Sequence, residues 1–273
     1  MGCTKGAVSP EPAPQPDYSR IADSGATDPA EDPAAEVWSK YLAVAPGEPA
    51  RPFRLEGSLR YTQPKGNGNR LSFYLWSNGG KPFRLDAAAG FNSLAVAARE
   101  GEREFLAYVP EENKAYEYKG RQTPRFVLPG LGEPLPLSIG DMAALLEGRY
   151  DRLFSDEYTL AEPVKPGAFP ELGESARKFD GYAYTLLRGP LPGQLLLNSS
   201  GAPVLWKSSD GWSILIEPES QGQKVRKLTI AHSKGYKAVV LVKDREYPTE
   251  FNDSQLALLV PSGVEVLPIK RMK

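Results

Sequence analysis

The sequence predicts a mainly β protein with α-helices, built as a strongly curved antiparallel sheet. Apolar and polar residues alternate with a period of two along many short segments, and turn residues recur between these segments. Two stretches carry helical spacing instead. A closed barrel and an open curved sheet with helices plugging its concave face both suit this pattern, and two helices separated by many strands favour the open sheet.

Composition excludes several functional classes. Lys and Arg number 33 against 34 Asp and Glu, so no charge excess would draw the chain to nucleic acid. Cys3 is the single cysteine and His232 the single histidine, which excludes an intramolecular disulfide and the usual His-rich or Cys-rich metal sites. We therefore expect no cofactor and no metal. No apolar run approaches the roughly 20 residues that span a bilayer, so membrane attachment would be covalent or peripheral.

Residues 1–32 form the first predicted domain. After Cys3 the chain is rich in Pro, Ala, Ser, Gly and acidic residues and has scarcely any larger aliphatic side chain. Such a segment cannot bury enough apolar surface to offset its loss of conformational entropy on ordering. We predict a disordered tether over residues 4 to about 32 and a folded domain over residues 33–273.

A short amphipathic helix is predicted at the start of the folded domain, in DPAAEVWSKYLA. Asp32 can cap it and Pro33 takes its first position. Trp38, Tyr41 and Leu42 fall on one face, which we expect to be buried.

The second predicted helix lies in LSIGDMAALLEGRY. Ser138 and Asp141 have the spacing of a capping box, and Gly148 stands where the helix would end. Its apolar stripe consists of Met142, Leu145 and Leu146. Glu147, beside this stripe, is expected to be exposed.

The predicted strands lie on both sides of this helix. They are FRLEGSLRY and RLSFYLW before it, and GYAYTLL, GQLLLN, APVLWKS, WSILIEP, KVRKLTIA and YKAVVLV after it. Residues 162–175 are predicted to be an irregular connection, since this stretch has no apolar periodicity.

The order of these motifs resembles the LolA/LolB family of bacterial lipoprotein carriers and receptors. The resembling stretches are VWSKYLA, RLEGSLRY, LSFYLWSNGGKPFRLDAAAGFNSLAVAAREG, LPLSIGDMAALLEGRY and LALLVPSGVEVLPI. The resemblance covers most of residues 35–267 and rests on order and spacing. It implies an open β-barrel, or half-barrel, of about eleven antiparallel strands with a short helical lid over an apolar concavity that receives acyl chains.

The resemblance also implies a role for Cys3. In LolB-like receptors the mature chain, after removal of a signal peptide, begins at a cysteine that carries acyl groups such as palmitate. We therefore expect Cys3 to be the lipid anchor. Thr4 follows it in place of the aspartate that retains lipoproteins in the inner membrane, which favours the periplasmic face of the outer membrane. The alternatives are an inert thiol or an N-terminal myristoylation signal, which Gly6 does not fit.

The expected function is non-enzymatic binding of the acyl chains of lipoproteins, or of another hydrophobic ligand, by a monomeric chain that acts as a chaperone in lipoprotein transport. The residues expected to line the ligand cavity are Phe73, Trp76, Leu85, Phe105, Met142, Leu145 and Leu146. Phe91, in the turn AAAGFNS, is the candidate probe for a membrane or ligand, unless it folds back beside Leu94.

No catalytic residues are predicted. Ser199 and Ser200 lack the G-x-S-x-G elbow, and His232 lies at a strand end beside a turn. The alternative function is a structural or regulatory envelope module on the same fold that binds a protein partner. A large apolar cavity would favour the ligand carrier, whereas a tightly packed interior would favour the module.

Overall fold

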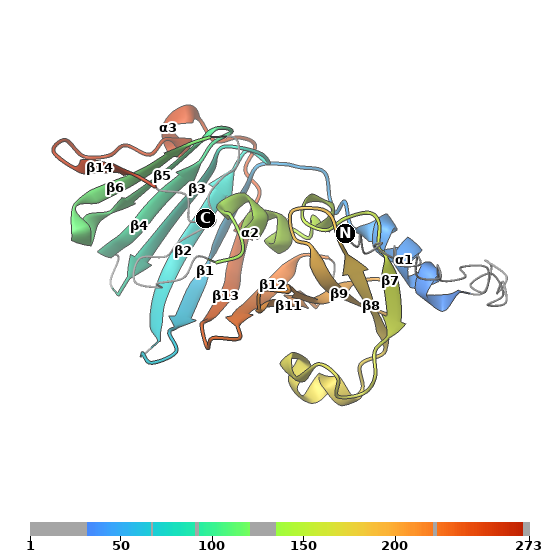
Figure 1. Cartoon of the computed structure of the whole chain (residues 1–273). Coiled ribbons are helices and arrows are strands. Elements are labelled where there is room, and N and C mark those ends of the chain that lie inside the picture. The colour runs from blue at the N-terminus through green and yellow to red at the C-terminus, as the bar shows by residue number, and fades with distance from the viewer. Residues whose placement is uncertain (1–31, 67, 91–92, 121–134, 221–222, 270–273) are drawn as a thin grey trace, which may run out of the picture. The chain divides into compact units, whose positions relative to one another are not determined.

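One sheet of fourteen strands organises the chain in a computed structural model that describes residues 32–66, 68–90, 93–120, 135–220 and 223–269 (Figure 1). The strand order is β14-β6-β5-β4-β3-β2-β1-β13-β12-β11-β10-β9-β8-β7. Neighbours in the described part of the chain are antiparallel, except β14, which runs parallel to β6. Because β14 and β7 are the two edges, the sheet is open, as predicted.

The strands are β1 (Phe53–Thr62), β2 (Asn69–Ser77), β3 (Phe83–Ala89), β4 (Ser93–Glu100), β5 (Glu104–Val109), β6 (Lys114–Lys119), β7 (Leu160–Pro163), β8 (Gly181–Leu186), β9 (Gly193–Asn198), β10 (Pro203–Lys207), β11 (Trp212–Pro218), β12 (Val225–His232), β13 (Lys237–Glu246) and β14 (Glu265–Pro268). The helical segments are α1 (Pro33–Val44), η3 (Pro110–Glu112), α2 (Ile139–Leu146), η4 (Tyr150–Arg152), η5 (Pro170–Arg177) and α3 (Asp253–Leu256).

The strand count exceeds the expected eleven because short strands extend the sheet. The edge strands β7 and β14 have four residues each and are mostly exposed, so they carry no clear apolar alternation. The prediction of an irregular connection over residues 162–175 was wrong at both ends. Its first two residues belong to β7, and its last six belong to η5.

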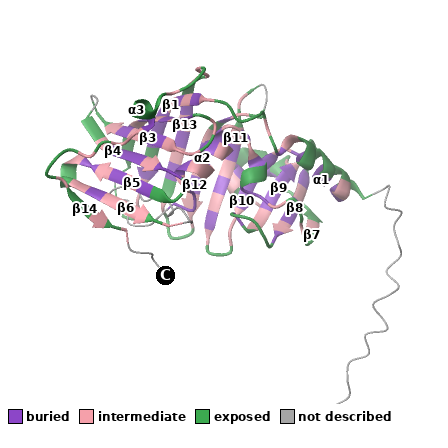
Figure 2. Cartoon of the chain, turned by 90° about the horizontal axis from the view of Figure 1, so that it is seen from above, coloured by how far each residue is buried: buried purple, intermediate pink, exposed green. Residues whose placement is uncertain are grey.

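Alternating side chains give the sheet two different faces (Figure 2). In β1, β2 and β3, Leu55, Leu75 and Leu85 lie side by side and are buried on the concave face. Their strand neighbours Arg54, Trp76 and Arg84 form the matching row on the convex face.

The sheet bends next to Gly57, where the register between β1 and β13 shifts. A Cβ at this position would lie 2.3 Å from the Leu241 carbonyl oxygen and 2.6 Å from the Phe73 ring. Glycine therefore allows β13 and Phe73 to approach the β1 backbone, and a bulge of this kind increases local twist.

Helix α1 covers the β8 end of the concave face. Its buried residues are Ala34, Val37, Trp38 and Tyr41. The Tyr184 hydroxyl of β8 donates a hydrogen bond of 2.7 Å to the Ala34 carbonyl oxygen. Leu42, predicted to be buried, is 41% exposed because the stripe that packs runs through positions 34, 37, 38 and 41.

Two chain segments cover parts of the convex face. Segment η5 places Leu172 and Ala176 in a second apolar cluster with Ala183, Leu196 and Leu205. Near α3, backbone carbonyls of the C-terminal segment accept hydrogen bonds from the side chains of β2 and β3: Trp76 Nε1 to Gln255 O is 3.0 Å, and Arg84 Nη1 to Ala257 O is 2.9 Å. None of the helices in the described ranges is long and apolar enough to cross a membrane.

Candidate hydrophobic-ligand site

Helix α2 lies on the concave face and contacts β3 on one side and β12 on the other (Figure 1). The predicted capping box is confirmed: Ser138 Oγ accepts from the Asp141 N–H at 3.1 Å, and the Asp141 carboxylate accepts from the Ser138 N–H at 2.9 Å. Gly148 follows the helix with φ of +73°, a conformation in which a side chain would be strained, so the predicted end is also confirmed.

Six of the seven predicted cavity residues share one apolar core, with exposures between 0% and 7%. They are Phe73, Leu85, Phe105, Met142, Leu145 and Leu146. Phe73, Leu85 and Phe105 of the sheet therefore belong to the same core cluster as the apolar face of α2. Trp76 lies apart from them on the convex face, because β2 places Leu75 and Trp76 on opposite sides of the sheet.

The N-terminal end of α2 is held by a buried carboxylate. The Glu100 side chain is 2% exposed. It accepts a hydrogen bond of 2.9 Å from the Gly140 N–H and forms an ion pair of 3.2 Å with Lys81 Nζ. A Cβ on Gly140 would lie 3.0 Å from the Phe83 ring. Glycine at this position thus lets the first turn of α2 rest directly on β3 and β4.

The C-terminal end of α2 is held by a buried guanidinium. Arg245 donates to Glu147 at 2.6 Å and to Glu219 at 2.7 Å, and it also contacts the Val225 carbonyl oxygen. The side chains of Arg245 and Glu147 are only 9% and 12% exposed. The prediction that Glu147 is exposed was therefore wrong. Arg245 pairs with Leu55 in the register and so points to the concave face, where it reaches the end of α2.

An aromatic cluster fills the β8 end of the concave face. The Trp38 ring lies 4.8 Å, centroid to centroid, from each of Tyr41, Tyr158 and Tyr184. Burial, together with the charges of nearby carboxylates, raises the pKa of Tyr41 well above its usual range. Within the described ranges, its hydroxyl oxygen is buried and has no hydrogen-bond partner.

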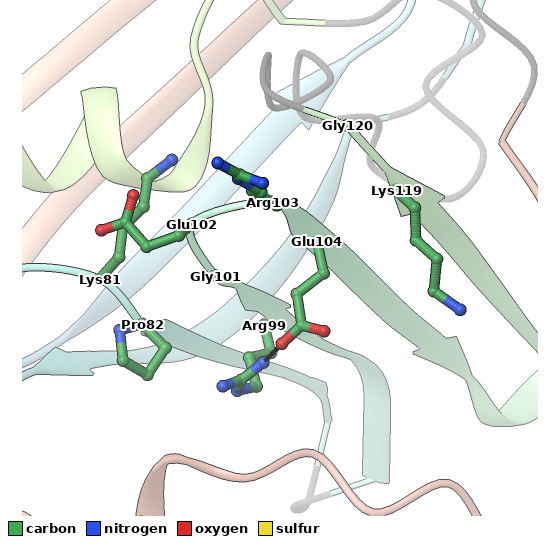
Figure 3. A pocket seen from close by; sticks show the side chains of 9 residues that line it. All are labelled: Lys81, Pro82, Arg99, Gly101, Glu102, Arg103, Glu104, Lys119 and Gly120. Carbon is green, nitrogen blue, oxygen red and sulfur yellow. Dashed lines mark hydrogen bonds and ion pairs between the residues drawn. The ribbon is translucent and has the colours of Figure 1, made fainter.

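A charged pocket of about 760 Å³ opens at the other end of the sheet (Figure 3), and its lining residue Arg99, which is in register with Arg84, lies on the convex side. Its lining residues are Lys81, Pro82, Arg99, Gly101, Glu102, Arg103, Glu104, Lys119 and Gly120. They come from the β2–β3 turn, the β4–β5 hairpin and the end of β6. We did not predict this pocket, because exposed charges in turns have the same sequence pattern as solvated loops.

The remaining candidates are placed as follows. His232 lies at the end of β12, where its Nδ1 accepts a 2.9 Å hydrogen bond from the Lys234 N–H. Ser200 lies in the β9–β10 turn and donates to Asn198 at 2.7 Å. Cys3 and Phe91 fall outside the described residues. Among those residues, no group of three or more His, Cys, Asp or Glu side chains could hold a metal ion.

Comparison with known proteins gives structural likeness without sequence matches. No protein-family model matches the sequence, and no curated protein matches it. Among solved structures, a DUF1329 family protein from Desulfovibrio piger is similar with a TM-score of 0.53 and 11% identity, over 83% of this chain and 98% of that one.

Two further solved structures are similar at lower scores. A LolA superfamily protein from Nitrosomonas europaea has a TM-score of 0.47 and 12% identity, over 82% of this chain and 97% of that chain. A putative outer membrane lipoprotein-sorting protein domain from Vibrio parahaemolyticus has a TM-score of 0.46 and 9% identity, over 82% and 95% of the two chains. At these identities the likeness concerns the fold, and the fold class predicted from the sequence, an open and curved antiparallel sheet with a few helices, is confirmed.

Proposed function

We propose that this chain is a non-enzymatic protein of the bacterial cell envelope that binds an acyl chain on its concave face, in the place that α2 occupies. The observation that carries the proposal is the way α2 is attached. Its apolar face covers the packed core, while a hydrogen bond from the Gly140 N–H to Glu100 and an ion pair between Glu147 and Arg245 hold its two ends. Polar contacts at the ends can be replaced by water when the helix moves away.

The covered surface suits an acyl chain because it is apolar and continuous across the sheet. Each methylene that replaced an α2 side chain there would contribute roughly 0.8 kcal/mol. Helix α2 has eight residues, fewer than the roughly 12–15 that an isolated helix needs in water, so its helical state depends on docking. We infer that α2 and the ligand compete for one surface.

The attachment to the envelope belongs to the same proposal. Cys3 would carry the lipid anchor, and the segment up to residue 32 would let the folded domain reach lipoproteins or membrane lipids at the periplasmic face of the outer membrane. A Cys3→Ala chain expressed with a signal peptide should leave the membrane fraction and stay folded. Retention in the membrane at the wild-type level would disprove the anchor.

The competition between α2 and the ligand gives the decisive experiment. Glu147→Gln keeps the shape of the side chain but removes its charge, and Ala144→Ser is a matched control on the same helix. Weakening the docking of α2 by about 1.4 kcal/mol raises the displaced population tenfold, and the apparent affinity for a fluorescent fatty acid should rise with it. The control should bind like the wild type. Unchanged affinity in a destabilised Glu147→Gln chain would contradict competition.

A second function is favoured by the packing of the interior. Leu145 and Leu146 are fully buried, as a protein-binding module with a filled core requires. If the wild-type chain and Glu147→Gln both fail to take up any fatty acid, the acyl-chain proposal is wrong and the protein-binding module remains.

A further inference from the structure

We propose that the β2–β3 turn, with the sequence SNGGKP over residues 77–82, couples the docking of α2 on the concave face to the docking of the C-terminal segment (residues 251–257) on the convex face. When α2 is displaced, this segment would then also detach from β2 and β3. The coupling itself requires no ligand. Its role, which is to report on the convex face that the acyl-chain site is occupied, rests on the proposed function.

One end of the turn is connected to the N-terminal end of α2. Lys81 Nζ pairs with one carboxylate oxygen of Glu100, and the other oxygen accepts the hydrogen bond from the Gly140 N–H. A single buried carboxylate thus joins the turn to the helix. Because a buried carboxylate that loses a donor is costly, displacement of α2 favours a rearrangement of Glu100 and of the Lys81 side chain paired with it.

The middle of the turn lies against the C-terminal end of α2. The Gly79 carbonyl oxygen accepts a hydrogen bond of 3.5 Å from Nη1 of Arg149, and the Arg149 N–H donates to the Ala144 carbonyl oxygen of α2 at 2.8 Å. A Cβ on Gly79 would lie 2.7 Å from the Arg51 backbone nitrogen, and φ at this position is +85°. Glycine is therefore required for this close approach. The β2–β3 turn is thus connected to both ends of α2.

The turn also holds the C-terminal segment. Asn78 forms a reciprocal pair of hydrogen bonds with the Phe251 backbone: Nδ2 donates to the carbonyl oxygen at 2.9 Å, and Oδ1 accepts from the N–H at 2.8 Å. The hydrogen bonds from Trp76 and Arg84 to later carbonyl oxygens of the segment follow along the chain. Asn78 is therefore the residue through which the turn positions the segment.

The C-terminal segment has a second connection to α2. Tyr247, four residues before Phe251, donates a hydrogen bond of 3.3 Å from its hydroxyl to the carboxylate of Glu147, the C-cap of α2. Contacts therefore run from Glu147 through Tyr247 and Phe251 to the turn and back to α2. Contiguous contacts of this kind can carry coupling when both sites bias one two-state element, which here is α2, docked or displaced. Such coupling is reciprocal, so the docked segment should also stabilise docked α2.

The test measures amide hydrogen exchange by mass spectrometry on the full chain without ligand. Two substitutions perturb α2 outside the turn: Ser138→Ala removes its N-cap, and Ala144→Gly lowers its helix propensity. Asn78→Ala breaks the side-chain link to Phe251. The matched control is Asn198→Ala, which removes an asparagine that holds the β9–β10 turn through two backbone N–H groups. Thermal melting checks that every variant folds.

We expect Ser138→Ala and Ala144→Gly each to speed exchange in α2 about fivefold, the change typical of a lost N-cap or an added helix glycine. Exchange over residues 251–257 should rise by a similar factor. In the Asn78→Ala background these residues should already exchange faster, and Ser138→Ala should add less than about twofold, because the link is broken. In the Asn198→Ala background the response to Ser138→Ala should match that of the wild type.

Three results would overturn the coupling. The first is faster exchange in α2 with unchanged exchange over residues 251–257. The second is an equal response of these residues to Ser138→Ala in the wild-type and Asn78→Ala backgrounds. The third is unchanged exchange of α2 in both Ser138→Ala and Ala144→Gly, which would show that α2 does not open separately from the sheet.

Added laurate, a fatty acid, separates the coupling from the proposed function. If laurate binds and speeds exchange in α2 but not over residues 251–257, the coupling is wrong and the acyl-chain function stands. If the variants show the coupling but neither the wild type nor Glu147→Gln binds laurate, the acyl-chain function is wrong and the coupling stands. Faster exchange of both segments on laurate binding supports both.

Discussion

The two ends of the sheet differ in their surroundings. At the β8 end, α1, β8 and the segment before β7 bring Trp38, Tyr41, Tyr158 and Tyr184 into one aromatic cluster. At the β4–β6 end, Phe83 and Tyr118 are only half-buried, and a charged pocket opens nearby. Aromatic rings therefore fill the first end, whereas charged side chains surround a pocket at the second.

The largest expected effect tests the β8 end as a core. Trp38→Ala removes a buried indole from the aromatic cluster and should lower the free energy of unfolding by about 3–5 kcal/mol, because the cavity adds to the lost burial. Urea denaturation measures this change. Leu42→Ala, on the exposed side of the same helix, should cost less than about 0.5 kcal/mol. Equal losses in the two variants would contradict a packed end.

The next effect concerns the attachment of α2 at its C-terminal end. Arg245→Met leaves the largely buried Glu147 carboxylate, 12% exposed, without the cation that pairs with it and should lower the free energy of unfolding by about 3 kcal/mol in urea denaturation. Adding Glu147→Leu should restore much of this loss, since the unpaired charge is then gone. If the double variant is less stable than Arg245→Met alone, the two residues are not coupled as described.

Substitutions of Gly140, in the first turn of α2, should have smaller effects on stability, and the loss should increase with the size of the new side chain. Gly140→Val adds atoms at a position where even a Cβ would crowd the Phe83 ring, and overpacking of this kind costs about 2 kcal/mol. Gly140→Ala should have a smaller effect, because a gain in helix propensity of about 1 kcal/mol offsets part of the crowding. Thermal melting of the two variants checks the order. A Val variant as stable as wild type would show that α2 does not rest closely on β3.

The smallest expected effect is a gain in stability, unlike the losses predicted above. Tyr41→Phe removes a buried hydroxyl that has no hydrogen-bond partner in the described part of the chain, and it should stabilise the protein by up to about 1 kcal/mol. Because burial raises the pKa of Tyr41, the folded chain keeps its phenol protonated at pH values where an unfolded tyrosine, with a pKa of about 10, ionises.

The raised pKa of Tyr41 makes the effect of Tyr41→Phe on stability depend on pH. The stabilisation due to the raised pKa of Tyr41 is complete below pH of about 10 and is lost as the pH rises above it. Urea denaturation between pH 9 and 11 should therefore show a steeper loss of stability in the wild type than in Tyr41→Phe. Identical slopes would mean that the hydroxyl is accessible to solvent.

The sequence alone determined the fold class and the local chemistry of its helices. Period-two alternation marked the central strands, because each of them buries one face only. Ser138, Asp141 and Gly148 marked the ends of α2, because capping and a left-handed conformation are local properties. The apolar residues of the core were also recognisable, since Phe73, Leu85, Phe105 and the α2 stripe are large and periodic.

Tertiary structure alone decided which residues meet across the sheet. Trp76 was assigned to the cavity from its residue type, but strand register places it on the convex face under the C-terminal segment. Arg245 and Glu147 are 98 residues apart, and Lys81 lies in the β2–β3 turn whereas Glu100 ends β4, so no local pattern predicts either pair. Side-chain periodicity is a property of each strand, whereas burial of a charge depends on which distant segment covers it.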